Sequence, residues 1–450
     1  MRLKSPWKAR LTDGEGNPST RLLEALSDDI LSGLLAGGDR LPPHRELAWT
    51  LGLGVGTVTK AYAVLERRGL ARSIKGRGTF VASFQSENRA TIDFSVNAIP
   101  PMLSDRLLAR TLSTVSRKID AQHVHLRPPL AGHDAHRRIF GKWLESLGIF
   151  VEPNRIILTG SGQQALWLAF DTLCGGGGLI ITERLSYPGA IALARHRGHP
   201  IAGVEIDEEG MVPHDLARVL DDPNNQRRRR LVYLTPSLHN PTTASMSLGR
   251  RQEIIGICRQ RDVQIVEDGV YTLGSSTDYP PLVALAPDNV FHVTSLSKTL
   301  TSGLRLGVLV LPEKWITSAE EALQIIPLAA SPLDYSLLEE WFTSGVVEAT
   351  RTSLQAEASR RAHLAVSLLS DRKIVTNPAA FHAWIPMPHA QAEAFVSSAE
   401  MMGVIVTPPD AMRADRQDKS TGIRLCLGGP SIDELSRGLS ILAKFQSGPA

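Results

Sequence analysis

The chain has 450 residues, 42% of them hydrophobic and 21% charged, so it has room for about two or three globular domains. No apolar run approaches the roughly 18 residues of a membrane span, and the N-terminus lacks the apolar core of a signal peptide. The three cysteines, Cys174, Cys258 and Cys426, show no metal-binding spacing. We therefore expect reduced thiols, a cytoplasmic location and no membrane partner.

The net charge of +3 is unevenly distributed. Residues 1–83 contain 13 Lys and Arg against 8 Asp and Glu, a local charge of +5, whereas the rest of the chain carries −2. The positive excess therefore lies at the N-terminus, as expected if only that part of the chain meets a polyanion.

Three helices are predicted in the N-terminal region. Apolar residues at helical spacing indicate a first helix over residues 22–34, ending at Gly37-Gly38. A second helix begins at Pro43 or just after it, because proline suits a first turn. After the turn at residues 51–54, a third helix runs roughly from Gly56 to Arg68. Two helices joined by a short glycine-containing turn are typical of a helix-turn-helix.

The third helix has an apolar and a polar face. The residues expected to face inward are Val58, Ala61, Tyr62 and Leu65. Its N-terminal end, the part that enters the major groove of DNA, presents Gly56, Thr57, Thr59 and Lys60 outward. We expect Thr57, Thr59 and Lys60, with Arg45 of the second helix, to contact DNA.

A basic, glycine-rich hairpin follows at residues 75–81, and Arg77 at its tip would reach a narrow groove or phosphates. Three motifs in this order resemble the winged helix-turn-helix of the GntR regulator family: Leu41-Pro-Pro-His-Arg-Glu-Leu-Ala48, Gly56-Thr-Val-Thr-Lys-Ala-Tyr62 and Gly76-Arg-Gly-Thr-Phe-Val81. Many members carry Ser-Arg before the threonine of the recognition helix, whereas this chain has Gly54-Val55. A plain helical bundle with solvated basic residues would not explain the order of the motifs.

The remainder of the chain alternates strands with helices. We predict a DNA-binding domain at 1–83, a polar linker at 84–91 and a large domain at 92–450. Strands are expected at residues 155–159, 179–182, 231–235, 263–266, 290–293 and 306–311, with helices at 163–173 and 190–197. This pattern predicts an α/β domain with a mostly parallel sheet that is buried on both faces.

Chemistry-bearing residues follow several of these strands, where ligands of such sheets gather. Lys298 lies between Ser297 and Thr299, and its amine suits a Schiff base with pyridoxal phosphate (PLP). The phosphate would be held by hydroxyls, an arginine fork and a helix N-terminus, supplied by Ser295, Ser297, Arg305, Ser161, Gly162 and Gln163.

Five further residues complete the predicted site. Asp268 would pair with the pyridine nitrogen, and Tyr271 and Asn240 would bond the phenolic oxygen. Tyr187 would stack on the ring, and Arg424 would clamp a carboxylate. Taken singly, three of them have a plainer reading: a strand-end cap for Asp268, a core position for Tyr187 and a turn for Asn240-Pro241. Only their joint order favours the cofactor.

That order strongly resembles fold-type I aminotransferases over roughly residues 92–445. The matching motifs are Thr159-Gly-Ser-Gly-Gln-Gln-Ala165, Ser186-Tyr-Pro-Gly189, Asn240-Pro-Thr242, Glu267-Asp-Gly-Val-Tyr271, Ser295-Leu-Ser-Lys-Thr299 and Gly303-Leu-Arg-Leu-Gly307. The resemblance implies a small C-terminal α+β subdomain at about 335–450. Two departures stand out: Thr243 replaces a usual glycine, and Arg127 replaces a tyrosine that reaches the partner subunit's phosphate.

A GntR-type winged helix fused to such a domain resembles the MocR/GabR class of bacterial regulators. The resemblance implies a transcription factor that binds promoter DNA, holds PLP at Lys298 and senses a small amine or amino acid. It also implies a head-to-tail homodimer. Two alternatives stay open: a working aminotransferase with a DNA-binding head, and a regulator for which PLP itself is the signal.

Overall fold

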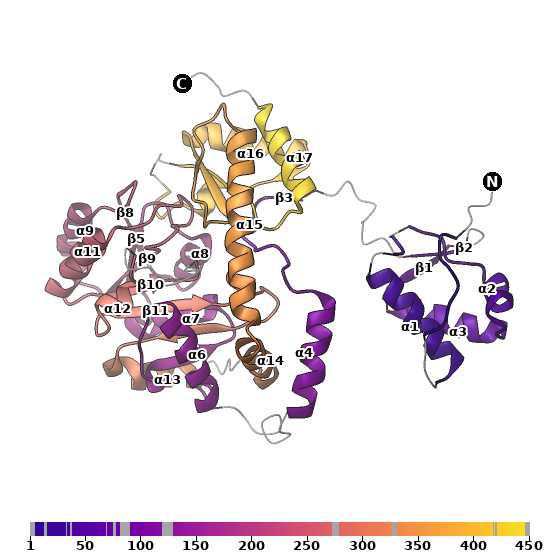
Figure 1. The fold of residues 1–450 in the computed structure, drawn as a ribbon. Helices are drawn as coiled ribbons and strands as arrows, with labels where there is room; N and C mark the ends of the chain where they lie inside the picture. The colour runs from indigo at the N-terminus through magenta and orange to yellow at the C-terminus, as the bar shows by residue number, and fades with distance from the viewer. Residues whose placement is uncertain are drawn as a thin grey trace. The chain divides into compact units, whose positions relative to one another are not determined.

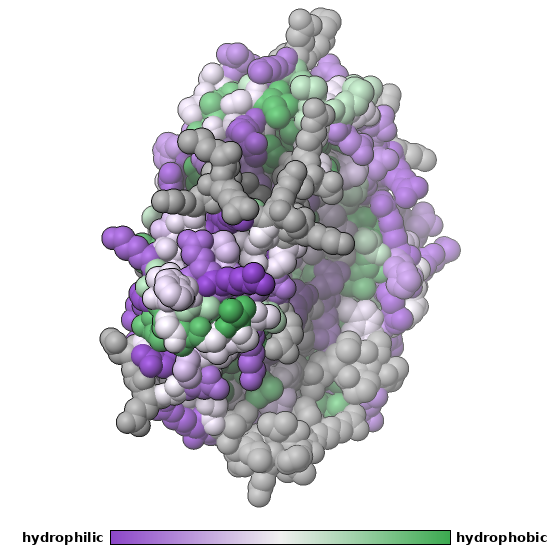
Figure 2. All heavy atoms as spheres, turned by 90° about the vertical axis from the view of Figure 1, so that its right-hand side faces the viewer, coloured by the Kyte–Doolittle hydropathy of each residue, from purple (hydrophilic) through white to green (hydrophobic). Residues whose placement is uncertain are grey.

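The computed structural model describes residues 5–12, 16–32, 34–36, 38–68, 70–74, 78–81, 91–118, 129–271, 279–325, 331–416, 418 and 421–445. The chain divides into two compact units, Met1–Ala90 and Thr91–Ala450, which we call the head and the large unit (Figure 1). Among the described helices, none combines the length and apolar character needed to cross a bilayer. Figure 2 shows hydrophilic residues over much of the face it presents, with hydrophobic residues in small groups between them.

The head contains three helices and a hairpin: α1 (Pro18–Leu31), α2 (His44–Leu51), α3 (Val55–Arg67), β1 (Ala71–Ile74) and β2 (Gly78–Val81). Asn17 caps α1 by accepting from the Ser19 amide, and Pro18 occupies its first turn. The helix ends at Leu31, earlier than predicted. Leu34, expected on its apolar stripe, therefore lies beyond the helix and is 76% exposed, and Leu35 is buried instead.

One apolar core holds the head together. Val58, Ala61, Tyr62 and Leu65 of α3 are at most 1% exposed, which confirms the predicted inward face. They pack with α1, and the Tyr62 hydroxyl donates to the Pro42 carbonyl at 2.8 Å. Gly52 adopts a left-handed φ of 63° that ends α2 and turns the chain into α3. The core thus fixes the angle between α2 and α3.

A seven-stranded sheet forms the centre of the large unit. Its order is β4 (Ile156–Thr159), β12 (Gly307–Val310), β11 (Val290–Ser295), β10 (Gln264–Asp268), β9 (Arg230–Leu234), β5 (Leu179–Glu183) and β6 (Ile201–Val204). All neighbours pair in parallel except β12, which is antiparallel to both β11 and β4. The predicted, mostly parallel sheet is therefore confirmed.

Helices cover both faces of this sheet (Figure 1): α6 (Asp134–Ser146), α7 (Gly162–Cys174), α8 (Pro188–His196), α9 (Pro213–Asp221), α11 (Leu248–Gln260) and α13 (Ile316–Ile325). Consecutive strand residues point to opposite faces, so Ile265 and Val266 of β10 enter two different apolar cores. Burial on both faces leaves the carboxyl ends of the strands as the open edge for ligands.

A smaller subdomain contains the antiparallel strands β13 (Val375–Thr376), β14 (His382–Pro386) and β16 (Gly422–Cys426). They pack with α15 (Val346–Leu368), α16 (His389–Met401) and α17 (Ile432–Ala443). Strand β3 (Ile92–Asp93) pairs in parallel with β15 (Val404–Ile405). The first residues of the large unit therefore belong to its C-terminal layer. Helices α4 (Asp105–Lys118) and α14 (Pro332–Thr343) pack against each other.

Candidate functional site

A cavity of about 330 Å³ lies at the carboxyl ends of the strands. Such a volume suits a small molecule. Every residue predicted from the sequence to bind the cofactor or a carboxylate lines it except Asn240: Ser161, Gly162, Gln163, Tyr187, Asp268, Tyr271, Ser295, Ser297, Lys298, Arg305 and Arg424. Asn240 reaches the site through hydrogen bonds to two of them. The topology thus gathers residues that are up to 329 positions apart, Ser95 and Arg424, around one space.

One end of the cavity is built to hold an anion. The N-terminus of α7 opens onto it, with Ser161 as the cap that accepts from the Gln164 amide at 3.1 Å. Gln163 is tied to the Gly189 carbonyl at 2.8 Å. Ser295 is 3% exposed, while Arg305 is exposed at the rim. Hydroxyls, free helix amides and a guanidinium together suit a phosphate.

Glycine allows two backbones to meet at this end. A side chain on Gly307 of β12 would lie only 2.3 Å from the Ser161 carbonyl carbon and 2.6 Å from the Gly162 nitrogen. Only glycine fits at such a separation. Strand β12 therefore packs directly against the backbone at the first turn of α7.

Asp268, the last residue of β10, also lines the cavity and is 3% exposed. Burial raises the pKa of its carboxyl group, and a hydrogen bond from the Tyr233 hydroxyl to Oδ2, 2.8 Å long, counteracts part of that rise. The Val270 amide donates to Oδ1 at 3.3 Å. An anionic carboxylate held in this way can pair with a protonated ring nitrogen.

Lys298 lines the same cavity, and its Nζ donates to the backbone carbonyl of Asn97. Burial lowers the pKa of its amine. Because a lower pKa increases the neutral fraction, the amine is better prepared to attack a carbonyl carbon.

Asn240 forms hydrogen bonds with two residues that line the cavity. Asn240 donates from Nδ2 to the Tyr271 hydroxyl at 2.9 Å and accepts at Oδ1 from Arg424 Nη1 at 2.8 Å. Arg424 is 4% exposed, and its Nη2 donates to the Ser95 carbonyl at 2.7 Å and to Thr407 at 2.8 Å. Its Nε is buried and has no partner among the described residues. That donor is available to an acceptor on a ligand.

Sequence reasoning missed four residues at the site: Ser95, Asn97, Tyr233 and Thr407. Asn97 also donates from its side chain to the Tyr271 hydroxyl at 3.1 Å. None of the four lies in a motif with a recognisable pattern. Tyr233, two positions before the end of a predicted strand, offered the one usable signal, because it is a polar tip in an otherwise apolar run.

Tyr187 lines the cavity and also packs against the apolar core beside α7 and α8, while its stacking on a cofactor ring stays a prediction. Thr243 keeps a left-handed φ of 64°, the conformation that glycine adopts most easily. Arg127 lies outside the described residues.

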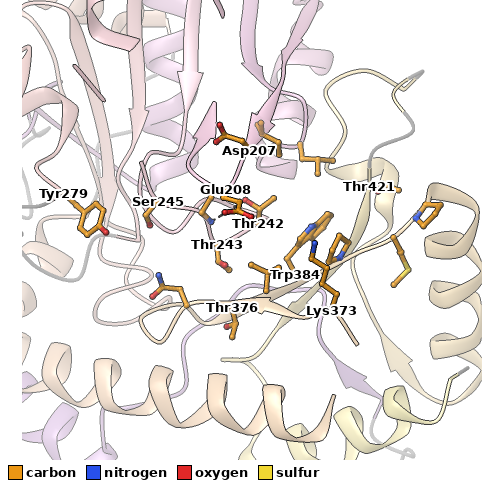
Figure 3. A pocket seen from close by; sticks show the side chains of 18 residues that line it. Asp207, Glu208, Thr242, Thr243, Ser245, Tyr279, Lys373, Thr376, Trp384 and Thr421 are labelled. Atoms are coloured by element: carbon orange, nitrogen blue, oxygen red, sulfur yellow. Dashed lines mark hydrogen bonds between the residues drawn. The ribbon is translucent and has the colours of Figure 1, made fainter. Parts of the chain in front are cut away.

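A second, larger cavity of about 1210 Å³ adjoins the loop that carries Asn240. Figure 3 shows Thr242 and Thr243 on one wall and Thr376 and Trp384 of the small subdomain on the other. Residues 242–245 of this loop line the second cavity, and Asn240 is hydrogen-bonded to two residues that line the first.

The predicted DNA contacts lie on the head's surface. Arg45, Thr59 and Lys60 are exposed and Thr57 is half-buried, while Arg77 lies outside the described residues. The Thr59 hydroxyl donates to the Val55 carbonyl at 3.0 Å and lies 3.0 Å from His44 Nδ1. It is thus already engaged within the head, whereas Arg45 and Lys60 extend into solvent.

Each of the two units matches a known protein family. Residues 89–442 match the family described as aminotransferase class I and II, and residues 18–81 match the bacterial regulatory proteins of the gntR family. The HTH-type transcriptional regulator TauR of Rhodobacter capsulatus is 30% identical over 71% of this chain and 72% of its own. The vitamin B6 salvage pathway transcriptional repressor PtsJ of Salmonella typhimurium is 27% identical over 85% and 88%.

Solved structures resemble the large unit. An archaeal alanine:glyoxylate aminotransferase superposes with a TM-score of 0.72 at 24% identity, covering 86% of this chain and 94% of that one. The α-aminoadipate aminotransferase LysN of Thermus thermophilus gives 0.69 at 23%, covering 79% and 92%. At these identities the likeness shows the fold alone. The chain belongs to the aminotransferase class I and II family of pyridoxal-phosphate proteins and, with its gntR-type head, to the group of HTH-type transcriptional regulators that includes TauR.

Proposed function

We propose that this protein is a cytoplasmic transcriptional regulator that binds promoter DNA and responds to a small amine or amino acid through PLP held at Lys298. The observation that carries the proposal is the convergence of Lys298, Asp268 and Arg424 on one cavity, in a chain whose other unit is a helix-turn-helix. We assign DNA binding to residues 1–83, the linker to 84–91 and ligand binding to 92–450, with a small subdomain at about 335–450.

The residues of the cavity fit PLP group by group. Lys298 supplies the amine for its aldehyde, Asp268 the negative charge for its ring nitrogen, and the α7 N-terminus with Ser295 and Arg305 the donors for its phosphate. Tyr271 and Asn240 supply polar groups for the phenolic oxygen. When bound, PLP supplies an aldehyde that condenses reversibly with amines and a ring that withdraws electrons.

Arg424 is the residue suited to an effector carboxylate. It is buried, and its unpartnered Nε offers a hydrogen bond that no described protein group takes. A carboxylate that binds there would compete with Ser95 and Asn240 for the same guanidinium. An amine that binds the cofactor would also change the hydrogen-bond partner of Lys298, which is now the Asn97 carbonyl.

These contacts offer a route from ligand to DNA. Ser95 and Asn97 follow Thr91 closely, so the segment that binds Lys298 and Arg424 is the one that enters the large unit from the N-terminal side. An effector that binds two arrangements of this segment unequally would shift their populations. We also propose a head-to-tail homodimer, so that two heads read two half-sites.

The test is DNA affinity in the presence and absence of ligand. Fluorescence anisotropy at physiological salt would compare the full-length, PLP-loaded protein on the DNA upstream of its own gene with random DNA of equal length. We expect specific binding, and an effector that changes the dissociation constant by roughly 5- to 150-fold. Equal affinity for both DNAs, with and without PLP, would contradict a regulatory role.

Two experiments separate the proposal from its alternatives. The complete set of Lys298, Asp268 and Arg424 is also what an aminotransferase needs, and steady-state turnover with an amino acid and 2-oxoglutarate would reveal one. PtsJ, a relative, is named a vitamin B6 salvage repressor, which favours PLP itself as the signal. In that case PLP alone, without any amine, would change the affinity for DNA.

A further inference from the structure

We infer that Tyr233 is a positioning residue for Asp268. Its hydroxyl orients the carboxylate toward the ring nitrogen of the cofactor and favours the charged form of that carboxylate. The inference rests on the proposed binding of PLP at Lys298. It adds to the site a residue from β9, a strand with no described side chain that lines the cavity itself.

The sheet brings the two side chains together. In the parallel pair of β9 and β10, Tyr233 lies opposite Val266, and Asp268 follows Val266 by two residues on the same face. The Tyr233 hydroxyl donates to Oδ2 of Asp268 at 2.8 Å, and both side chains are at most 3% exposed. The phenol ring packs edge-on against Phe170 of α7, with centroids 5.7 Å apart. Strand and helix thus fix the hydroxyl in place.

The hydroxyl is the principal donor to a carboxylate that otherwise has little support. Oδ1 receives the Val270 amide at 3.3 Å, a long bond, whereas Oδ2 receives only Tyr233 among the described side chains. Burial favours the neutral acid, and the bond from Tyr233 favours the anion. Burial and the nearby Asp268 raise the pKa of Tyr233 well above its ordinary value, so the phenol remains a donor.

Other charged or titratable groups also face Asp268. His292 on β11 and Lys298 on the cavity side favour its charged form. Glu183, buried at the end of β5, opposes it, and burial raises the pKa of Glu183 to about 7. Tyr187 and Tyr271 lie on the cofactor side. Of all these, Tyr233 alone forms a side-chain hydrogen bond with Asp268 among the described residues.

The experiment separates the hydroxyl from the ring. Tyr233→Phe in the full-length protein keeps the ring that packs against Phe170 and removes the donor. PLP would be titrated into the apoprotein between pH 5 and pH 9, with visible absorbance as the readout. We expect affinity about tenfold weaker at neutral pH, because hydrogen bonds to charged groups are strong. Since the pKa of Asp268 rises, affinity should also begin to fall at a higher pH than in the wild type.

A matched control and a second variant keep the result interpretable. Tyr335→Phe makes the same chemical change at a buried tyrosine of α14 that does not line the cavity. It should change neither the affinity for PLP nor the pH at which that affinity falls. Asp268→Asn should abolish the pH-dependent part, and adding Tyr233→Phe to it should have no further effect.

Three outcomes are decisive. If the wild type binds no PLP, the proposed function fails. If it binds PLP but Tyr233→Phe has the same affinity and pH profile, or is weakened equally at every pH, Tyr233 is merely structural and the inference fails. Should Tyr233→Phe not fold, a fall in affinity toward acid pH that Asp268→Asn leaves unchanged would overturn the inference, because that fall would not belong to Asp268.

Discussion

The head and the large unit place their functional side chains in opposite ways. In the head, Arg45 and Lys60 are exposed on the surface of a small apolar core. In the large unit, Asp268 and Arg424 are at most 4% exposed and are held by other polar groups inside the protein. The head thus separates the residues that fold it from those proposed to bind DNA, whereas in the large unit the residues proposed to bind ligands also hold the fold together.

The difference has an energetic consequence. An exposed cation contributes little to stability, so its replacement should change binding alone. A buried group with several hydrogen bonds leaves unsatisfied partners behind when it is removed, so its replacement should reduce stability as well as binding. Five substitutions test this contrast.

The largest effect is expected from Lys298→Ala. The wild-type protein loaded with PLP and treated with borohydride should gain the mass of one reduced cofactor, and the variant should gain none, because its amine is gone. Lys60→Ala, in the head, is the control and should be labelled fully. An adduct of unchanged yield on another lysine would show that Lys298 is not the attachment site.

Arg424→Ala should lose both function and stability. We expect at least a tenfold loss of response to a carboxylate-bearing effector, and unfolding easier by about 2 kcal/mol, since the Ser95 carbonyl and the Asn240 amide oxygen each lose a charged donor. Effector-dependent DNA binding and thermal unfolding measure the two. A retained response would mean that the effector has no carboxylate or that another cation binds it.

Gly307→Ala tests the support beneath α7. A new methyl group would meet the Ser161 backbone at 2.3 Å, so we expect a loss of about 1–3 kcal/mol in stability together with weaker PLP binding. Gly303→Ala, in the same motif, places its methyl 3.7 Å from the nearest atom and is the matched control. Chemical denaturation and PLP titration should show a change for the first variant only.

Lys60→Ala should show the smallest effect, confined to DNA. The slope of log affinity against log salt should fall by about one, equally for specific and random DNA, while the unfolding temperature stays constant. Arg45→Ala should instead relax the preference at one base pair by about 1–3 kcal/mol if its fork contacts a guanine. A lower unfolding temperature for either variant would break the contrast between the two units.

Much of this architecture could be predicted because its signals are local. Short β-branched runs marked six strands of the central sheet, and the helix over 163–173 is observed at Gly162–Cys174. The inward residues of α3 followed from helical periodicity. The end of α1 did not, because Leu34 continues the apolar spacing after the backbone has left the helix.

The missed residues share a physical cause. Ser95 and Asn97 act largely through backbone carbonyls, which carry no sequence signal. They reach the cavity because β3 pairs with β15, a contact between residues more than 300 positions apart. Tyr233 acts through the register of β9 with β10, and Thr407 through its contact with Arg424 of β16 within the small subdomain. Such long-range pairings are set by the whole sheet rather than by any motif.

The pairing of β3 also orders events during synthesis. Contacts within the head span short separations, such as the 20 residues from Pro42 to Tyr62, and all of them can form once Val81 has been made. Ser95 must wait for Arg424, 329 residues later, an interval of roughly 20–60 s at ordinary translation rates. For that time a ribosome-bound chain holds a complete head and no finished ligand site. A chain that ended before Gly422 would have a head able to fold but would never complete the ligand site.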